Sequence, residues 1–367
     1  MPIELLYQLA LCDIPQIGVV QAKILVSHFG SAQSIFKAKK SQLEKIDGIG
    51  AARAASIITF SNFTKAEQEL SFIEKYKITP LFITDKNYPQ RLFNCYDPPT
   101  LLFYKGNADL NASKIAAVVG TRNNSDYGKH ITEKLIRDLA NENVLIISGL
   151  AFGIDAIAHK SALKTNQQTV AVLAHGLDSI YPPEHSGLAK NILNQGGLLT
   201  EFRSGKKPDR HNFPSRNRIV AGISDAVVVV ETNLKGGSMI TAELADGYNK
   251  DVFAFPGKTT DSKSSGCNYL IKNNKAILLT DAEQLLETMG WQKKQKEKIK
   301  KQKELFIELS TEEKIILDLL NQKEACHIDE LNFKSGLSSS AVAAAILNLE
   351  LQNIISSLPG KMYALVP

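Results

Sequence analysis

Three glycine-rich turns, each expected after an apolar strand, are the residues of this chain best suited to chemistry with phosphate. They are Gly120-Thr121-Arg122, the segment 147–155 with Ser148, Gly149 and Gly153, and Lys235-Gly236-Gly237-Ser238. Glycine lets a backbone come close to an anion, and the helix after such a turn directs free N–H groups and its positive dipole end toward the same point. Three turns of this kind in one domain predict a site for several phosphates.

Arginines accompany these turns. Arg122 stands directly in the first turn, and Arg216 and Arg218 flank Asn217 at the expected start of a helix. A guanidinium group offers a planar fork of donors that fits two phosphate oxygens. We therefore predict phosphate contacts for these four residues. The alternatives are an internal ion pair between Arg122 and Asp155, and a structural role for one of the other two arginines.

Other combinations of polar residues are less informative. Asp155 and His159 share a helix face, but no third ligand accompanies them, so helix capping and a core hydrogen bond are favoured over metal binding. The first turn lacks the Gly-x-Gly-x-x-Gly pattern of dinucleotide sites, and the P-loop pattern is absent. We expect no metal and no cofactor.

Length and composition set the broad class. A chain of 367 residues with 44% hydrophobic residues is expected to form two or three domains. The four scattered cysteines favour free thiols in a reducing compartment. With neither a leader-like N-terminus nor an apolar run long enough to span a bilayer, we expect a cytoplasmic protein without membrane contact. The net charge of +5 is compatible with nucleic-acid binding but does not require it.

The central segment alternates apolar strands with amphipathic helices. The expected strands are 115–120, 144–149, 169–174, 198–202, 226–231, 252–256 and 276–279, and the helix that carries the arginine pair is expected to begin at Arg216. This alternation predicts a doubly wound, mostly parallel, Rossmann-like α/β sheet with helices on both faces. Its ligand is expected beyond the carboxyl ends of the strands, where the strand order reverses. Short strands at 80–83 and 101–104 are expected to extend the sheet.

An N-terminal module, residues 1–75, contains an approximate repeat. Ile14-Pro15-Gln16-Ile17-Gly18 and Ile46-Asp47-Gly48-Ile49-Gly50 each lead into a helix. The repeat resembles the helix-hairpin-helix motif of SAM-like domains, in which Gly48 and Gly50 would present N–H groups to a phosphate beside Arg53. Packing or protein docking is an equal alternative.

The C-terminal module, residues 310–367, reads as three helices and a hairpin and resembles a winged helix. Its expected recognition helix, 338–350, contains neither Lys nor Arg, which favours protein contact over DNA reading. Residues 291–309 form a polar, lysine-rich linker. The predicted core domain is therefore 76–290.

Taken in order, the motifs of the core resemble the DNA-processing protein A family, also called DprA or Smf. The resemblance is carried by Val119-Gly120-Thr121-Arg122, the segment 148–159, Gly176-Leu177-Asp178 with Tyr181-Pro182 and His185, the segment 213–222, the segment 237–242, Phe255-Pro256-Gly257 and the segment 266–271. The flanking modules fit the longer members of that family.

The resemblance implies a protein without catalytic activity that binds single-stranded DNA, protects it during natural transformation and recombination, and loads the RecA recombinase. It also implies a homodimer formed through the core. Pro183 departs from the pattern, because relatives often carry a basic residue there. The predicted DNA contacts are Gly120, Thr121, Arg122, Ser148, Gly149, Tyr181, His185, Arg216, Asn217, Arg218, Lys235, Gly237 and Ser238.

The alternative is an enzyme of the nucleotide phosphoribohydrolase type. The segment 236–243 faintly resembles the phosphate turn of those enzymes, with Glu243 at the position of their acidic residue. Met239 and Ile240 replace the Gly-Thr pair of that turn, so apolar side chains would partly fill the phosphate pocket.

Overall fold

The computed structural model describes residues 3–292, 309–323 and 325–366, so nearly all of the predicted linker 291–309 lies outside the described residues. The chain divides into two compact units, Met1–Lys293 and Lys294–Pro367. The domain boundary predicted at residue 75 falls within the first unit and stays a prediction. None of the helices in the described part of the chain is long and apolar enough to cross a membrane.

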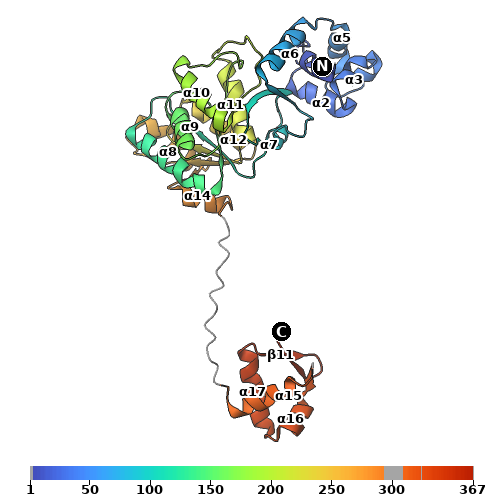
Figure 1. Cartoon of the computed structure of the whole chain (residues 1–367), viewed down its shortest axis with the longest axis vertical. Helices are drawn as coiled ribbons and strands as arrows, with labels where there is room; N and C mark the ends of the chain where they lie inside the picture. The colour runs from blue at the N-terminus through green and yellow to red at the C-terminus, as the bar shows by residue number, and fades with distance from the viewer. Residues whose placement is uncertain (1–2, 293–308, 324, 367) are drawn as a thin grey trace. The chain divides into compact units, whose positions relative to one another are not determined.

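Six helices open the first unit (Figure 1): α1 Ile3–Leu11, α2 Val19–Phe29, α3 Ala32–Lys37, α4 Lys40–Leu43, α5 Gly50–Thr59 and α6 Thr64–Tyr76. The two turns of the predicted repeat bend alike, because Gln16 and Gly48 occupy equivalent positions with φ of 68° and 81°. This shared left-handed bend, which glycine adopts most easily, supports an internal duplication.

Arg53 ties these two turns together. Its Nε donates to the carbonyl of Gln16 (3.2 Å) and its Nη1 to the carbonyl of Gly48 (2.6 Å). Two of the guanidinium N–H donors are thereby engaged by the backbone of its own segment, and the predicted phosphate contact of Arg53 stays a prediction. Gly48 and Gly50 are exposed, and their phosphate contact stays a prediction.

A nine-stranded sheet forms the centre of the first unit, in the order β1-β2-β6-β5-β4-β3-β7-β8-β9. All neighbours from β6 to β9 are parallel, whereas β2 pairs antiparallel with β6 and with β1. This confirms the mostly parallel sheet and its two-strand extension. The strands are β1 Thr79–Phe82, β2 Leu101–Gly106, β3 Ile115–Val119, β4 Leu145–Ser148, β5 Thr169–Val172, β6 Gly197–Thr200, β7 Ala226–Val229, β8 Asp251–Ala254 and β9 Ile277–Leu278.

Helices cover both faces of this sheet (Figure 1). Apolar side chains that alternate along β3 separate into two cores, Ile115 and Ala117 on one face and Ala116 and Val118 on the other. Burial on both sides explains why the strands read as continuous apolar runs. One face carries α8 Asp126–Leu139, α9 Ile154–Lys164, α10 Ser186–Gln195 and α14 Ala282–Thr288, and the other carries α11 Asn212–Ile223, α12 Gly237–Gly247 and α13 Ser265–Lys272.

Helix α11 begins at Asn212 rather than at the predicted Arg216. The predicted start was wrong by about one turn, because a proline does not prevent a helix from beginning before it. Pro214 lies in the first turn, where its missing N–H costs no hydrogen bond. The earlier start brings Phe213 onto the helix beside Arg216.

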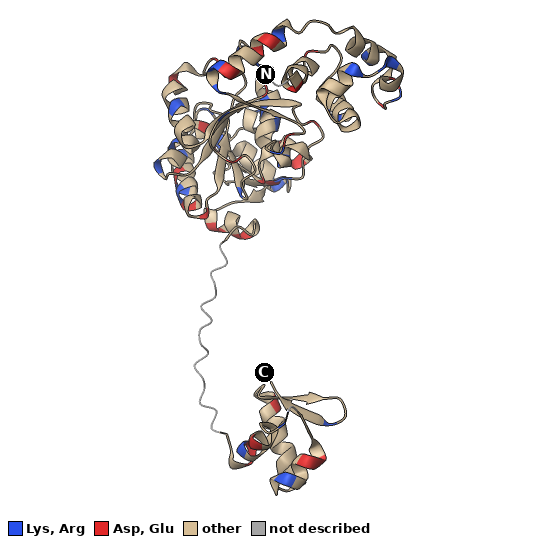
Figure 2. Ribbon diagram, turned by 45° about the vertical axis from the view of Figure 1, so that its right-hand side comes forward, with Lys and Arg blue, Asp and Glu red and all other residues tan. Residues whose placement is uncertain are grey.

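Partly buried polar contacts join the N-terminal helices to the segment that follows β6. Arg203 forms an ion pair with Asp13 (Nη1 to Oδ2, 2.6 Å) and also donates to the carbonyl of Leu9. Glu69 accepts from the backbone N–H of Ser204 at 3.1 Å and from its hydroxyl at 2.5 Å. These contacts explain why both segments form one unit. Elsewhere on this unit, Figure 2 shows charges of both signs spread over the outer elements, while the central strands are largely uncharged.

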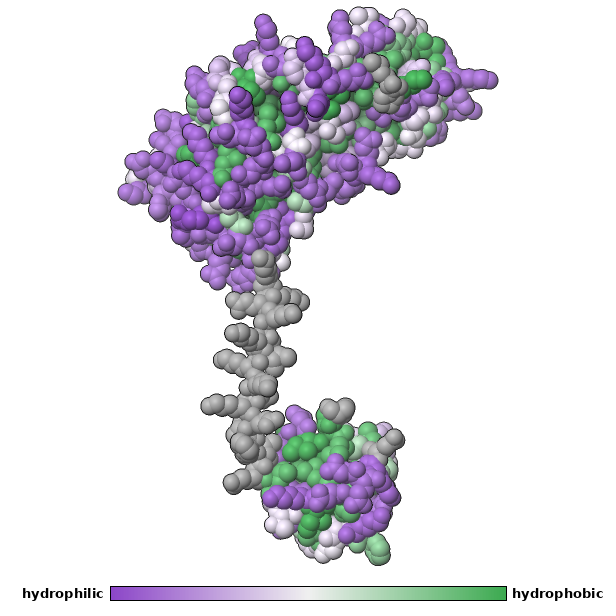
Figure 3. All heavy atoms as spheres, in the orientation of Figure 1, coloured by the Kyte–Doolittle hydropathy of each residue, from purple (hydrophilic) through white to green (hydrophobic). Residues whose placement is uncertain are grey.

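The C-terminal unit confirms the predicted winged helix. Its elements are α15 Thr311–Leu320, β10 Cys326–His327, α16 Ile328–Ser335, α17 Ser339–Leu351, β11 Ile355–Leu358 and β12 Met362–Leu365, with strand order β10-β12-β11. Figure 3 shows apolar surface on the visible face of this unit. Phe333 is 87% exposed, and Leu347 and Leu351 of α17 are exposed as well.

Candidate functional site

A cavity of about 730 Å³ lies at the carboxyl edge of the sheet. Its walls come from the segments that follow β3, β4 and β7 and from the first turns of α11 and α12. The strand order runs outward from β3 to β6 on one side and from β7 to β9 on the other, so the cavity is at the switch point. Of the predicted contacts, it is lined by Gly120, Thr121, Arg122, Gly149, Tyr181, Arg216, Asn217, Gly237 and Ser238.

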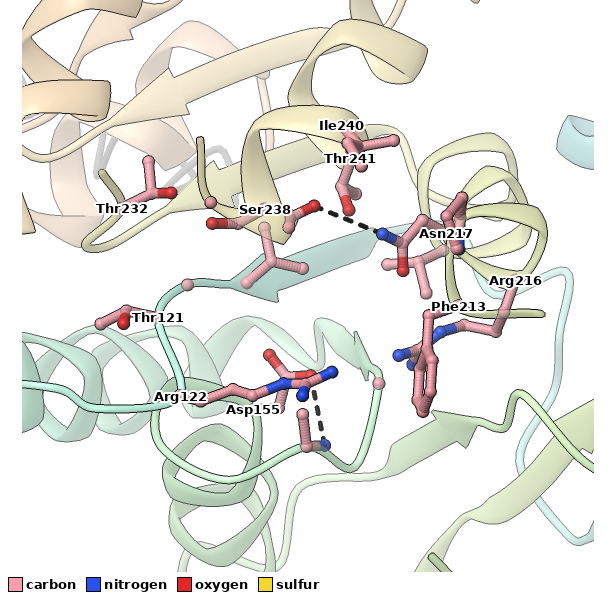
Figure 4. Close-up of a pocket in the computed structure, with 18 of the residues that line it drawn as sticks. Thr121, Arg122, Asp155, Phe213, Arg216, Asn217, Thr232, Ser238, Ile240 and Thr241 are labelled. Atoms are coloured by element: carbon pink, nitrogen blue, oxygen red, sulfur yellow. Dashed lines mark hydrogen bonds between the residues drawn. The ribbon is translucent and has the colours of Figure 1, made fainter. Parts of the chain in front are cut away.

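Arg122 reaches into this cavity from the turn after β3 (Figure 4). Its side chain is exposed, and the guanidinium carbon lies 5.3 Å from the centre of the Phe213 ring. The ion pairs formed by arginines in the described part of the chain involve Arg91, Arg137, Arg203 and Arg218. The alternative of a pair between Arg122 and Asp155 is therefore not found, and the Arg122 guanidinium faces solvent over an aromatic ring.

Gly153 sets the position of the Arg122 turn. Its φ of +76° is in the region that favours glycine, and a Cβ there would lie 2.2 Å from the carbonyl oxygen of Thr121 and 2.7 Å from the carbonyl carbon of Arg122. The next N–H, that of Ile154, donates to the same Thr121 carbonyl (3.2 Å). The start of α9 thus packs directly against the backbone that carries Arg122.

Arg216 lies beneath the Gly149 turn with only 4% of its surface exposed. Its Nη1 donates to the carbonyl of Val172 (2.7 Å), and a Cβ on Gly149 would come within 1.9 Å of the same nitrogen. Burial lowers the pKa of Arg216, and the nearby carboxylate of Asp155 opposes that shift. The floor of the cavity therefore contains the buried Arg216 cation, which fits there because residue 149 is a glycine.

Asp155 is the carboxylate that balances this cation. It is 7% exposed and accepts a hydrogen bond from the N–H of Ala151 (3.3 Å). Burial raises the pKa of Asp155, and the positive charge of Arg216 acts in the opposite direction. The predicted helix-capping role is not found, because Ala151 precedes α9 and the start of α9 has no side-chain cap; Asp155 instead supports the turn before the helix.

Two aromatic rings complete the wall beside Arg122. The rings of Tyr181 and Phe213 have centroids 6.1 Å apart, and Tyr181 is 45% exposed. The backbone N–H of Tyr181 donates to His175 Nε2 (3.2 Å), which fixes the loop that carries the ring. A pair of rings, one exposed and one partly buried, next to an arginine is the kind of surface on which nucleobases stack.

The first turn of α12 forms the remaining wall. Gly236 precedes the helix and provides no side-chain cap. Asn217 of α11 donates from Nδ2 to the carbonyl of Gly237 (3.3 Å), the dashed contact at the start of α12 in Figure 4. The N-terminal N–H groups of α12 are thereby held at the cavity.

Ser148 and His185, predicted as contacts, do not line the cavity. Ser148 is fully buried and its hydroxyl donates to the carbonyl of Val118 (2.7 Å). His185 is buried with Nδ1 at 2.8 Å from the carbonyl of Leu150, and because a carbonyl only accepts, Nδ1 carries the proton. Both residues support the backbone of the turns.

Arg218 and Lys235 also lie outside the cavity lining. Arg218 forms ion pairs with Glu201 and, at 3.7 Å, with Asp97. The alternative of a structural arginine therefore holds for Arg218, whose charge is balanced inside the unit. Lys235 is exposed on the loop that leads to α12.

Arg210 lines the cavity but was missed from the sequence. It is exposed, and its Nε donates to His211 Nε2 (3.2 Å). The signal was the basic run Lys206-Lys207-Pro208-Asp209-Arg210 directly before α11. A local count of charge would have detected it. Thr232, Asn233, Ile240 and Thr241 were missed as well, because their types carry no distinctive signal.

His159 has the core role that was predicted. Its Nδ1 lies 2.7 Å from the Thr169 hydroxyl, which donates its own proton to the carbonyl of Ile146 (3.0 Å). Nδ1 must therefore be the donor, and Nε2 is an unprotonated, buried nitrogen without a partner. Among the described residues, no group of three or more His, Cys, Asp or Glu is arranged to hold a metal ion.

His159 is expected to stay neutral at all pH values at which the protein is usually handled. Burial lowers its pKa to about 3. In a histidine-selective NMR titration of the full chain, its ring signal is expected not to move between about pH 5 and pH 8, whereas free histidine added as a reference titrates near its ordinary value. A titration midpoint for His159 near that of the reference would contradict this structure.

Fold and cavity together define a doubly wound α/β protein whose cavity, at the switch point of the sheet, is formed by arginines, aromatic rings and a helix N-terminus. Residues 79–290 match the family described as DNA recombination-mediator protein A. Residues 304–361 match the DprA winged helix domain, and residues 6–70 match a helix-hairpin-helix motif. The chain belongs to the DprA/Smf family of DNA-processing proteins.

Individual relatives agree with this assignment. Protein Smf of Synechocystis is 39% identical over 293 residues, which are 78% of this chain and 73% of that protein. The X-ray structure of DNA processing protein A from Streptococcus pneumoniae has a TM-score of 0.65 at 35% identity and covers 77% of this chain and 95% of that one. A structure of the Helicobacter pylori protein, described by its unique single-stranded DNA binding mode, has a TM-score of 0.53 at 31% identity and covers 58% of this chain and 95% of that one.

Proposed function

We propose that this chain binds single-stranded DNA in the cavity at the carboxyl edge of its sheet. The observation that carries the proposal is Arg122, an exposed guanidinium held over the Phe213 ring at the switch point. A guanidinium in that position can bind a backbone phosphate bidentately while the neighbouring rings stack on bases. The single-stranded DNA binding mode described for the Helicobacter pylori relative supports this proposal.

The cavity favours binding with little sequence preference. Its cations are Arg122, Arg210 and Arg216, and its exposed rings include that of Tyr181. Stacking is available to every base, and phosphate contacts carry no sequence information directly. Affinity is therefore expected to depend on strand length and salt rather than on base order.

Membership of the family supports finer proposals. We propose that the chain protects incoming DNA during natural transformation, loads the RecA recombinase onto it and forms a homodimer through the sheet-containing core. The exposed apolar residues Phe333, Leu347 and Leu351 support a protein partner for the C-terminal unit, since α17 carries neither Lys nor Arg.

We further propose that the cavity is not catalytic. Glu243, the acid of the enzyme alternative, is exposed and is not among the residues that line the cavity. The acids that line it are Asp155, beside Arg216, and Asp209, which accepts from the N–H of His211 (2.9 Å). Glycosidic hydrolysis uses a pair of carboxyl groups that flank the scissile bond, and the charge of one of these two acids, Asp155, is already opposed by that of Arg216.

The proposed function is tested by titrating labelled single strands with the full chain at several salt concentrations. We expect dT, dC and mixed strands of equal length to bind with affinities within about threefold, and the logarithm of affinity to fall linearly with the logarithm of salt. In parallel, nucleoside monophosphates are incubated with the protein. Release of free base, or no strand binding at low salt, would reject the proposal.

A further inference from the structure

Two buried donors of the cavity have no hydrogen-bond partner. Ser238 is 7% exposed and Arg216 is 4% exposed, and both line the cavity. The Ser238 hydroxyl and the Arg216 Nε make no hydrogen bond within the described structure. Buried polar groups are nearly always satisfied, so two unsatisfied donors in one cavity indicate a ligand that completes them.

The Ser238 hydroxyl belongs to the N-terminus of an eleven-residue helix, α12. No side chain caps this end, and a Cβ on Gly237 would meet no heavy atom within 4 Å. Packing therefore does not require glycine at position 237, whose missing side chain leaves open space in front of the helix. Asn217 holds the Gly237 carbonyl at 3.3 Å and so fixes the direction of the first N–H groups.

We propose that the N-terminus of α12 is a subsite for a terminal phosphate monoester of a DNA strand. This inference rests on the proposed function and adds recognition of a strand end to it. Because the Ser238 hydroxyl is buried, a phosphate oxygen must descend to the cavity wall to reach it. An internal phosphodiester carries a sugar on both sides, whereas a monoester has three free oxygens and can enter with these oxygens foremost.

Charge favours the same ligand. A phosphate monoester carries about −1.5 to −2 charges at neutral pH, more than the single charge of a diester, and so gains more from a helix N-terminus. Figure 4 shows Arg122 and Ser238 approaching the cavity from different elements, the turn after β3 and the start of α12. Arg122 is thus free to hold an internal phosphate while α12 holds the end.

The test compares three forms of one dT oligonucleotide: with hydroxyls at both ends, with a 5′-phosphate, and with a 3′-phosphate. Binding of each form to the full chain is followed by fluorescence anisotropy. We expect one of the two phosphorylated forms to bind about tenfold more tightly than the hydroxyl form, as for a charge-assisted hydrogen bond. The two phosphorylated forms show which end of the strand is recognised.

Two variants of Ser238 test the residue itself. Ser238→Ala removes a hydroxyl that has no partner, so the protein is expected to fold normally, and its affinities for the phosphorylated and the hydroxyl forms are compared as a ratio. The preference for the phosphorylated form is expected to fall to about twofold or less. Ser238→Asp places a negative charge where the helix dipole favours it and is expected to abolish the preference. Ser215→Ala, on the exposed side of α11 outside the cavity, is the matched control.

Equal affinities of the parent protein for all three forms would overturn the inference while leaving single-strand binding intact. A preference that survives both Ser238 substitutions would overturn it as well, because the end would then be held elsewhere. Failure of the hydroxyl form to bind at low salt would instead reject the proposed function, and the inference with it.

Discussion

Arg122→Ala is expected to weaken binding of single-stranded DNA by about 10- to 100-fold, and by the same factor for dT, dC and mixed strands. The Arg122 guanidinium is exposed in the cavity and lies 5.3 Å from the centre of the Phe213 ring, so its removal takes away the proposed phosphate contact without breaking an internal ion pair. The slope of log affinity against log salt is expected to decrease by about one. Filter binding or anisotropy over a salt series measures both quantities.

Arg137→Ala provides the control for this experiment. Arg137 is an exposed arginine in the last turn of α8, does not line the cavity, and its removal changes the net charge equally. It is expected to leave the affinity within about twofold. If Arg122→Ala bound DNA as tightly as the parent, the assignment of Arg122 to the DNA site would be lost.

Gly153→Ala is expected to destabilise the protein by about 2 to 4 kcal/mol and to reduce DNA affinity as strongly as the loss of Arg122. An alanine Cβ would need a positive φ of 76° and would collide with the Thr121 oxygen at 2.2 Å, a backbone atom that cannot swing away as a side chain can. The turn that carries Arg122 must then move. Urea unfolding measures the stability loss, and strand titration of the folded variant measures the affinity loss.

Gly187→Ala is the matched substitution. Gly187 lies in α10, and a Cβ there would meet no heavy atom within 4 Å. This change is expected to alter stability by no more than about 1 kcal/mol, in the stabilising direction, since alanine favours a helix. A Gly153→Ala variant as stable as the Gly187→Ala variant would show that the Arg122 turn does not depend on glycine at position 153.

The sheet and its switch point could be predicted because each strand is buried on both faces. Segments such as Ala226–Val229 are continuously apolar. This pattern is visible in the segment itself, without knowing which strands become its neighbours. The glycines at positions 120, 149 and 153 could also be recognised, for a different reason. Each glycine leaves space required by a close backbone or side-chain approach, and this requirement is visible in the residue type itself.

The ends of long side chains could not be predicted. Arg216 and Arg218 look alike in the sequence, yet one reaches the cavity floor while the other is paired with Glu201 and Asp97. These two partners lie in segments that meet α11 only after folding. The role of Arg53 was hidden similarly, because its acceptors include the carbonyl of Gln16 from the other half of the repeat.

Because the cavity lies across the β3–β7 pair, the proposed DNA binding would also stabilise the pairing of these two strands. Arg122 follows β3, and α12 follows β7. These two strands pair where the two halves of the parallel sheet meet. A DNA strand bound at both places would contact both halves at once. A ligand that binds only the folded protein raises the free energy of unfolding once its concentration exceeds its dissociation constant. The first unit is therefore expected to resist denaturation best while single-stranded DNA is bound to it.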